Sequence, residues 1–252
     1  MPVVDDDVLA PLMRLPAVTD SAAAARRAVD RLLRHRILRR CSADVSLETA
    51  LRGAQASAAL SGCELDLDQI RSGRATDPVA IGAVRVAGAV GELATTFRRA
   101  PMQALARLHV LAARDLAPPD RLGRPVIVGG AARRLGALPG LVTVPTSVPA
   151  VVVAAVVHGE LLTLRPFAVG NGVVARAAAR LTMVGRGLDP KALTVPELGH
   201  LVRREEYLAA ASAYASGDPD GVAAWIVHCC VALQRGAQEG LAICESLARG
   251  AA

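Results

Sequence analysis

The sequence predicts an all-α protein, a bundle of helices with one short β-hairpin. Helical spacing dominates the 252 residues, and in the first predicted helix leucines and arginines separate onto opposite faces. Capping residues, first-turn prolines and helix-ending glycines divide the periodic stretches from one another. Aromatic residues make up only 2% of the chain. A core with so few rings must be filled by alanine, valine and leucine, which suits closely packed helices.

Local signals delimit the predicted helices. Asp20 or Ser21 caps the first, Ser46 opens the second and Gly62 ends it, and Thr194 begins a capping box for a later one. The predicted helices span residues 20–40, 46–61, 77–98, 101–115, 148–164 and 171–184, with two more from residues 194 and 218 onward.

Residues 118–140 break the helical pattern with proline, glycine and arginine. The stretch RPVIVGG within them is the only strand material in the chain. We expect it to form one half of a short hairpin.

Composition argues against two classes of partner. The net charge is +6, but no compact basic run has the interleaved aromatic residues on which bases stack, so nucleic-acid binding is not expected. The most apolar stretch, residues 148–164, is interrupted by His158 and Glu160. It is also shorter than the ~20 residues of a membrane span, so we expect a buried helix and no membrane partner.

The cysteines indicate a reducing compartment. Their number is five, they lack the spacing of a disulfide framework, and no signal peptide is evident, so we expect a cytoplasmic protein. No C-x-x-C pair or Cys/His cluster in the sequence predicts a zinc site. The adjacent Cys229 and Cys230 are interpreted as small core residues.

The stretch TLRPFAVGNGVVAR, residues 163–176, carries the main functional signal. Gly170, Asn171 and Gly172 predict an exposed turn at the start of a helix. Its backbone N–H groups and the helix dipole both attract an anion such as phosphate. A simple turn with Asn171 as the helix cap accounts for the same three residues.

The longer stretch resembles the signature of the Fic family, also called Fido, which runs H-x-F-x-(D/E)-G-N-G-R-x-x-R. The preceding VVHGELLTL is similar to the helix before that motif, and ASAALSG, residues 56–62, resembles the family's inhibitory motif (S/T)-x-x-x-E-(G/N). The residues aligned with the signature are Arg165, Pro166, Phe167, Ala168, Val169, Gly170, Asn171, Gly172, Val173, Val174, Ala175 and Arg176.

The resemblance implies a Fic-like domain over residues 45–252, preceded by a helical extension over residues 1–44. It also implies a β-hairpin flap at residues 123–130 that docks a protein target by strand addition. Family members transfer AMP from ATP to a protein hydroxyl. In them the motif histidine takes the proton, the acidic residue holds Mg²⁺, and the glycine loop and two arginines hold the phosphates.

Three substitutions in the signature argue against that reaction. Arg165 stands at the position of the base, and a guanidinium cannot accept a proton near neutral pH. Loss of a general base costs ~10²–10⁴-fold in rate. Val169 stands at the metal position, so Mg²⁺ is not expected, and Val173 replaces the first arginine and removes a phosphate contact.

None of the remaining histidines is predicted to replace the base. His158 precedes Arg165 by seven residues, which is ~10 Å along a helix, and is interpreted as a core histidine. The spacing of His109, His200 and His228 brings none of them to the motif.

The phosphate-binding part of the signature is retained. Gly170, Asn171 and Gly172 keep the loop, Arg176 keeps the second arginine, and Arg165 adds a positive charge. The resemblance therefore implies a pocket for a nucleotide such as ATP, or for another phosphate anion, that binds without a metal and without efficient transfer.

The inhibitory motif is altered as well. Ser57 and Gly62 match it, but Ser61 stands where the family has the glutamate that pairs with the second signature arginine. Serine cannot form this ion pair, so we expect Arg176 to be free of that restraint. Glu64 is a weak substitute because it follows the helix-ending glycine.

Two other functions stay open. One is a protein-interaction or regulatory scaffold without nucleotide binding, including a homo-oligomer. The other is a transferase with a rearranged active site. The missing carboxylate at Val169 argues against Mg-nucleotide chemistry of the family's kind.

Overall fold

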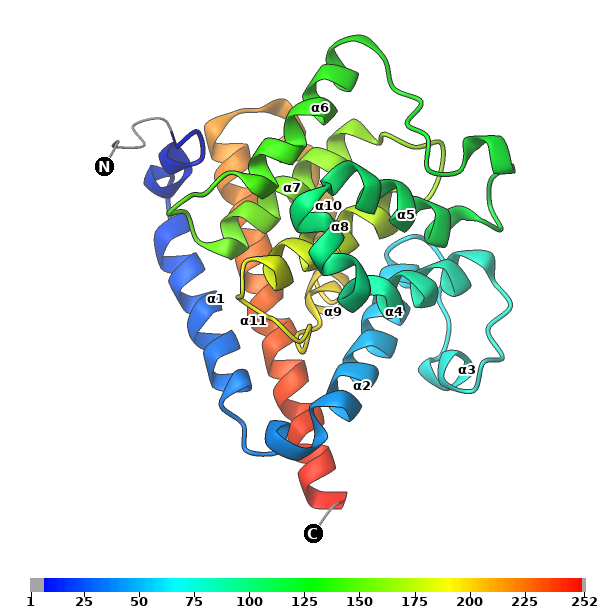
Figure 1. Ribbon diagram of the computed structural model, residues 1–252. Coiled ribbons are helices and arrows are strands. Elements are labelled where there is room, and N and C mark those ends of the chain that lie inside the picture. Colours follow the sequence, from blue (N-terminus) through cyan, green and yellow to red (C-terminus); the bar gives the residue numbers. More distant parts are fainter. Residues whose placement is uncertain (1–6, 251–252) are drawn as a thin grey trace.

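The computed structural model describes residues 7–250, and these form eleven α-helices and two 3-10 helices (Figure 1). Residues 1–6 and 251–252, at the outer ends of the predicted extension and domain, lie outside the described part. The all-α prediction is confirmed. In chain order the elements are η1 (Ala10–Arg14), α1 (Val18–Leu33), α2 (Leu38–Ala59), α3 (Leu67–Arg71), α4 (Pro78–Arg99), α5 (Pro101–Ala113), η2 (Pro119–Arg121), α6 (Gly129–Thr143), α7 (Ala150–Leu164), α8 (Asn171–Gly185), α9 (Pro196–Leu201), α10 (Arg204–Ser216) and α11 (Pro219–Gly250).

Helices α7 and α8 lie side by side at the centre of the bundle (Figure 1). Helix α7 is buried around almost its whole circumference. Its five valines are modest helix formers, so burial rather than propensity stabilises the helix. Helices α4 and α5 pack on α8, and α6, α10 and α11 pack on α7.

The apolar core has two main parts that meet along α7. Residues 151–156 of α7 pack with α1, α10 and α11. Val157 and Leu161, nearer the end of α7, pack with α2, α4, α5 and α8. The two parts therefore meet between Val156 and Val157, and the end of α7 and the start of α8 pack within the second part.

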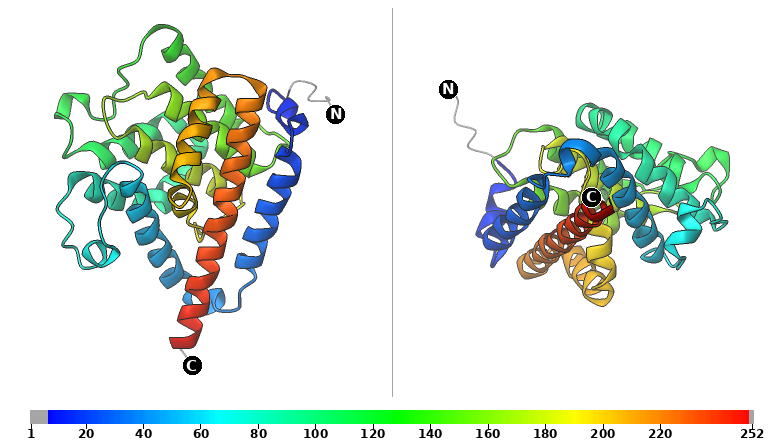
Figure 2. Two further views of the ribbon diagram at one scale, coloured as in Figure 1. Left: turned by 180° about the vertical axis from the view of Figure 1, so that it is seen from behind. Right: turned by 90° about the horizontal axis from the view of Figure 1, so that it is seen from below.

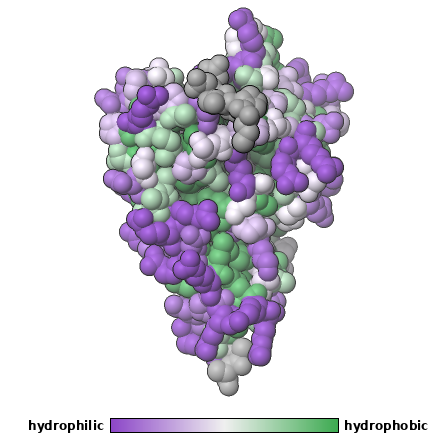
Figure 3. All heavy atoms as spheres, turned by 60° about the vertical axis from the view of Figure 1, so that its left-hand side comes forward, coloured by the Kyte–Doolittle hydropathy of each residue, from purple (hydrophilic) through white to green (hydrophobic). Residues whose placement is uncertain are grey.

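Helix α11 is the longest element, and α1 packs alongside it toward the C-terminal end of the molecule (Figure 2). The face that carries α1 is largely hydrophilic, with hydrophobic surface visible in a strip down its lower half (Figure 3). Helix α2 continues across residues 44 and 45, between which the sequence predicts a domain boundary. That boundary stays a prediction.

Several predicted helices are confirmed and three predicted caps are wrong. Asp20 and Ser21 lie inside α1, whose N-cap is Ala17. Helices α4, α5, α7, α8 and α11 begin within about two residues of their predicted starts. Ser46 lies inside α2, because the buried Leu38 and Val45 extend the helix on its N-terminal side. Its hydroxyl donates to the Lys191 carbonyl. Thr194 donates to Asp189 instead of capping α9. The predicted first helix is also interrupted, between α1 and α2.

The predicted hairpin is wrong, since no strand occurs in residues 7–250. Residues 123–128 are irregular, and α6 follows them where the sequence predicted no helix. Leu135, Leu138 and Val142 are buried at helical spacing. Their burial against the bundle outweighs the low helix propensity of glycine and proline in this segment.

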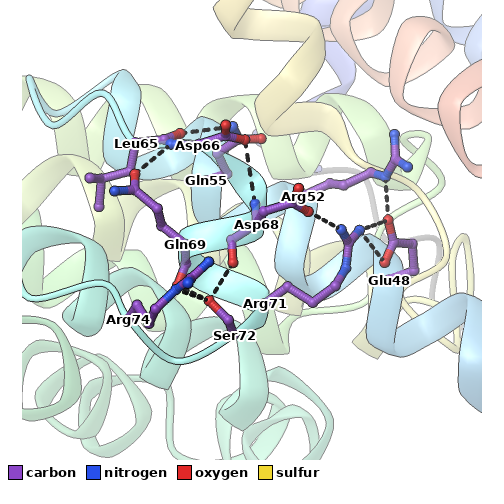
Figure 4. A network of polar contacts seen from close by, with 10 residues as sticks. All are labelled: Glu48, Arg52, Gln55, Leu65, Asp66, Asp68, Gln69, Arg71, Ser72 and Arg74. Atoms are coloured by element: carbon purple, nitrogen blue, oxygen red, sulfur yellow. Dashed lines mark hydrogen bonds and ion pairs between the residues drawn. The ribbon is translucent and has the colours of Figure 1, made fainter.

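Helix α3 was not predicted, and polar contacts attach it to α2 (Figure 4). The Arg71 guanidinium donates to both carboxylate oxygens of Glu48, at 2.8 and 3.1 Å, and to Asp68 at 2.7 Å. Gln55 of α2 donates to the Leu65 carbonyl at 2.9 Å. These contacts fix the segment that follows α2.

Within the described residues one helix, α4, has the length and hydropathy of a membrane span. It packs against α2, α5 and α8, and core helices of globular proteins meet the same criterion.

Candidate functional site

The predicted anion loop joins α7 to α8. Arg165 ends α7 in the left-handed conformation, with φ 45° and ψ 58°. Gly170, with φ 73°, precedes α8 and adopts a conformation that glycine reaches without strain. The buried Asn171 side chain accepts from the Phe167 N–H at 2.9 Å and donates to the Phe167 carbonyl at 2.7 Å. Asn171 therefore fixes the loop and does not cap α8, whose N-cap is Gly170.

The start of α8 offers backbone donors. Within residues 7–250 no acceptor pairs with the N–H groups of Asn171, Gly172 and Val173, whereas Val174 donates to the Gly170 carbonyl. The first N–H groups of a helix lack intrahelical partners and lie at its positive end. This end of α8 can therefore hold an anion.

Arg176 is a buried cation without an acidic partner. Only 4% of the residue is exposed. Its guanidinium donates to the Ser57 hydroxyl at 2.9 Å, the Ser57 carbonyl at 2.8 Å and the Ser61 hydroxyl at 2.7 Å, with a longer contact of 3.4 Å to the Tyr207 hydroxyl. No ion pair within residues 7–250 joins it to a carboxylate. These partners orient its charge but do not neutralise it.

Arg176 forms no ion pair with a carboxylate of residues 7–250, but hydrogen bonds to Ser57 and Ser61 hold it in place. Ser57 and Ser61 are one helical turn apart at the end of α2, so both reach the guanidinium. Gly62, with φ 91°, lies in the turn that follows. Glu64 does not substitute for the missing glutamate, because it is exposed and pairs with Arg204 at 3.4 Å.

A pocket of about 450 Å³ lies over this site. It brings together the predicted residues Ser61, Arg165 and Arg176 with the loop from Val169 to Val173. Ser57 and Gly62 do not line it. Its wall contains no aspartate or glutamate, so both charges on it are positive. The other lining residues are Leu60, Val79, Ala112, Leu116, Leu162, Tyr207 and Leu208.

Gly172 gives Arg176 its place in the pocket wall. A Cβ atom on Gly172 would meet the two terminal guanidinium nitrogens at 3.2 and 3.3 Å. The absence of a side chain at this position lets the arginine fold back over the first turn of α8.

His109 lies against the signature loop, contrary to the expectation from spacing. Its ring stacks on Phe167 with centroids 4.0 Å apart, and Nδ1 accepts from the Gly123 N–H at 2.9 Å. Burial lowers its pKa. The residue is 0% exposed, so its imidazole does not reach the pocket. Residues 123–130 are also joined to the loop by a bond from the Val126 N–H to the Pro166 carbonyl at 2.8 Å.

Tyr207 was not predicted and connects Arg176 to a group of buried histidines. Its hydroxyl lies 3.1 Å from Nε2 of His158, while Nδ1 of His200 lies 3.0 Å from Nε2 of His228. Burial holds the pKa values of His158 and His200 well below 6.5 and lowers that of His228 to about 4. These imidazoles are neutral at physiological pH. His158 is a buried, hydrogen-bonded histidine, as interpreted from the sequence.

No family model and no curated protein sequence matches the chain. Solved structures do match its fold. A Fic family protein from Desulfovibrio desulfuricans G20 has 22% identity and a TM-score of 0.70, over 90% of this chain and 75% of that one. Fic-1 from C. elegans has 16% identity and a TM-score of 0.64, over 96% and 76% of the two chains. A variant of Fic-1 has 18% identity and a TM-score of 0.58, over 86% and 71%. The chain therefore has the fold of Fic family proteins.

Proposed function

We propose that this protein binds a phosphate-bearing anion, an adenine nucleotide, in the pocket at the start of α8, and that it does not transfer AMP efficiently. The supporting observation is that Arg176, buried and unpaired with any carboxylate of residues 7–250, lines a pocket without acidic residues.

The charge of Arg176 favours a bound anion. A buried charge without a countercharge costs several kcal/mol after relaxation. The hydroxyl and carbonyl oxygens around Arg176 offset only part of this cost, since they carry no net charge. A phosphate would supply the countercharge through charge-assisted hydrogen bonds and would also accept from the N–H groups of α8. Arg165 also lines the pocket and adds attraction.

The size and lining of the pocket suit a nucleotide. Its volume of about 450 Å³ falls within the roughly 300–1,000 Å³ of small-molecule sites. Apolar side chains of α2, α4, α5 and α7 complete the wall, so an apolar ring can be buried beside the charged end. The likeness in fold to Fic family proteins adds support for ATP as the ligand.

The same wall lacks the groups that transfer would require. Arg165 stands at the position of the base, and a guanidinium is a hydrogen-bond donor with no acceptor for a proton. Val169 offers no oxygen to Mg²⁺. The imidazole of His109, which stacks on Phe167 in the loop, is fully buried. Binding without metal is therefore the expected behaviour.

Isothermal calorimetry with ATP, ADP and AMP in the presence of a chelator tests this proposal. We expect binding in the micromolar to millimolar range, and a loss of about tenfold or more in Arg176→Ala, since hydrogen bonds to charged groups contribute about 1.5–3 kcal/mol. Arg176→Lys keeps a charge and should lose less. Arg133→Ala, in an exposed residue of α6, is the control.

Two outcomes would overturn the proposal. One is the absence of heat at millimolar nucleotide, and the other is an unchanged affinity in a folded Arg176→Ala variant. Incorporation of label from ATP into lysate proteins, abolished by Arg165→Ala, would instead favour a rearranged transferase.

A second candidate function is protein docking without nucleotide. One observation favours it: Val126 and Val128, in the segment 123–130, are 41% and 83% exposed. Residues 123–128 of this segment are irregular, and an irregular stretch with exposed valines can pair with an extended peptide. Capture of a defined partner, lost in a Val126→Asp/Val128→Asp variant and insensitive to Arg176→Ala, would support it.

A further inference from the structure

Arg176 also lines a second, smaller cavity of about 30 Å³ in the interior of the bundle. Three side chains with metal-binding atoms meet at it: His158 of α7, His200 of α9 and Cys229 of α11. They are 1%, 4% and 8% exposed, and their ligand atoms lie within 4.8 Å of one another. The space is enough for one water molecule or one ion.

The hydrogen bonds around the two imidazoles leave one nitrogen of each ring available. His158 uses Nε2 for the Tyr207 hydroxyl, and His200 uses Nδ1 for His228. Among the hydrogen bonds of residues 7–250 none involves His158 Nδ1 or His200 Nε2. A metal-bound histidine has this arrangement, with one nitrogen on the metal and the other held by a neighbouring polar group.

We propose that His158, His200 and Cys229 form a binding site for Zn²⁺. Two imidazole nitrogens and one thiolate are a ligand set for zinc and not for Mg²⁺ or Ca²⁺. Zn–N bonds of about 2.0–2.1 Å and Zn–S bonds of about 2.3 Å place tetrahedral ligands roughly 3.3–3.8 Å apart. Ligand atoms as far apart as 4.8 Å must approach one another by about 1–1.5 Å. The fourth position is left for a water in the cavity.

Binding releases one proton. The S–H bond of Cys229 breaks, a Zn–S bond forms, and the proton passes to solvent. Both imidazoles are neutral, so each has one nitrogen lone pair to donate and releases no net proton. The ion and the thiolate together carry one positive charge beside Arg176. Glu197 lines the same cavity and offsets part of this charge, although it also pairs with Arg180 at 3.1 Å. The site does not depend on nucleotide binding in the larger pocket.

Cobalt substitution tests this site. The full chain, freed of metal with a chelator, is titrated with Co²⁺ and then with Zn²⁺ as competitor. We expect one Co²⁺ per chain, with the strong visible bands of tetrahedral cobalt and a thiolate-to-cobalt charge-transfer band that Zn²⁺ removes. Elemental analysis of protein purified from zinc-supplemented cells should also find zinc at a ratio close to one.

Adjacent cysteines provide matched variants. Cys229→Ser should abolish the charge-transfer band, whereas Cys230→Ser should keep it, because Cys230 is buried on the same helix but is not part of the group. His200→Gln should weaken Co²⁺ binding by about tenfold or more. Circular dichroism establishes that each variant is folded. Absence of stoichiometric metal in the parent protein, or a charge-transfer band that survives in folded Cys229→Ser or disappears in folded Cys230→Ser, would overturn the proposal.

Discussion

Ser57 and Ser61 determine, at the scale of single residues, the charge that Arg176 presents to the pocket. Their oxygens lie 2.7–2.9 Å from the guanidinium and fix its position. A carboxylate at the same distance would orient the guanidinium equally well and would also neutralise it. Replacing the motif glutamate by serine therefore keeps the orientation while it leaves the positive charge for a ligand.

Ser61→Glu should neutralise the positive charge that Arg176 offers to a ligand. Two unit charges about 4 Å apart interact by about 4 kcal/mol at an effective dielectric constant of 20, so nucleotide affinity should fall by roughly a hundredfold or more. Ser61→Ala loses one neutral hydrogen bond of about 0.5–1.5 kcal/mol, and affinity should fall by no more than about tenfold. Calorimetric titration of both variants measures the difference. Equal losses in the two would contradict the charge argument.

Close contacts between helices decide which elements form the histidine group. Gly199 of α9 lies so near α11 that a Cβ atom would be 2.1 Å from the Ala232 carbonyl oxygen. This approach places His200 on α9 beside His228 on α11, with their ring centroids 5.2 Å apart. A short helix of six residues thus carries a residue of the interior cluster because glycine lets its backbone touch its neighbour.

Gly199→Ala should destabilise the protein by about 1–3 kcal/mol or more, because the added methyl group overlaps backbone that cannot move aside. The control is Gly136→Ala in α6, where nothing lies within 4 Å of the added atom. There alanine should stabilise the helix by about 0.5–1 kcal/mol. Urea unfolding midpoints, compared at equal m-values, give the change in the free energy of unfolding for both variants. A Gly199→Ala variant as stable as the parent would show that α9 can move away from α11.

A group of neutral histidines lies inside a molecule with a net charge of +6. Burial first, and the Arg176 charge next, keep the pKa of His158 well below its ordinary value. The pKa of His200 is held down by burial and by the neighbouring His158. Burial and, next, the charge of Arg203 lower the pKa of His228 to about 4, and Glu206 opposes this effect. These histidines therefore stay neutral in the folded protein at pH values below about 6.5, where they become protonated in the unfolded chain.

Stability of the whole molecule should thus fall with acidification. As the pH drops below about 6.5 the unfolded chain binds more protons than the folded one, so the free energy of unfolding decreases by up to about 1.4 kcal/mol per pH unit for each of these histidines. The loss continues to about pH 4 for His228. Denaturant unfolding at several pH values between about 7 and about 5 measures the slope. His228→Gln should reduce the number of protons taken up on unfolding, which this slope measures, by about one. A free energy of unfolding that does not change with pH in the parent would contradict the neutral state of these histidines.

The fold was predictable where the signals are local. Asp77 caps α4 through a bond of 2.8 Å to the N–H two residues away, and Gly170 adopts a left-handed conformation before α8. Such features depend on a few neighbouring residues. The start of α6 was missed because its glycines and proline disfavour a helix locally, and only burial of its leucines in the bundle stabilises it.

By itself the sequence determined the all-helical class, the central helices and a glycine turn flanked by two arginines. Only the tertiary structure decided that Arg176 bonds Ser57 and Ser61, more than a hundred residues earlier, and that His158, His200 and Cys229 share one cavity. Caps and turns are set by sterics and hydrogen bonds within a few residues. Contacts between distant residues depend on how every helix packs against the others, and no single stretch of the chain encodes that arrangement.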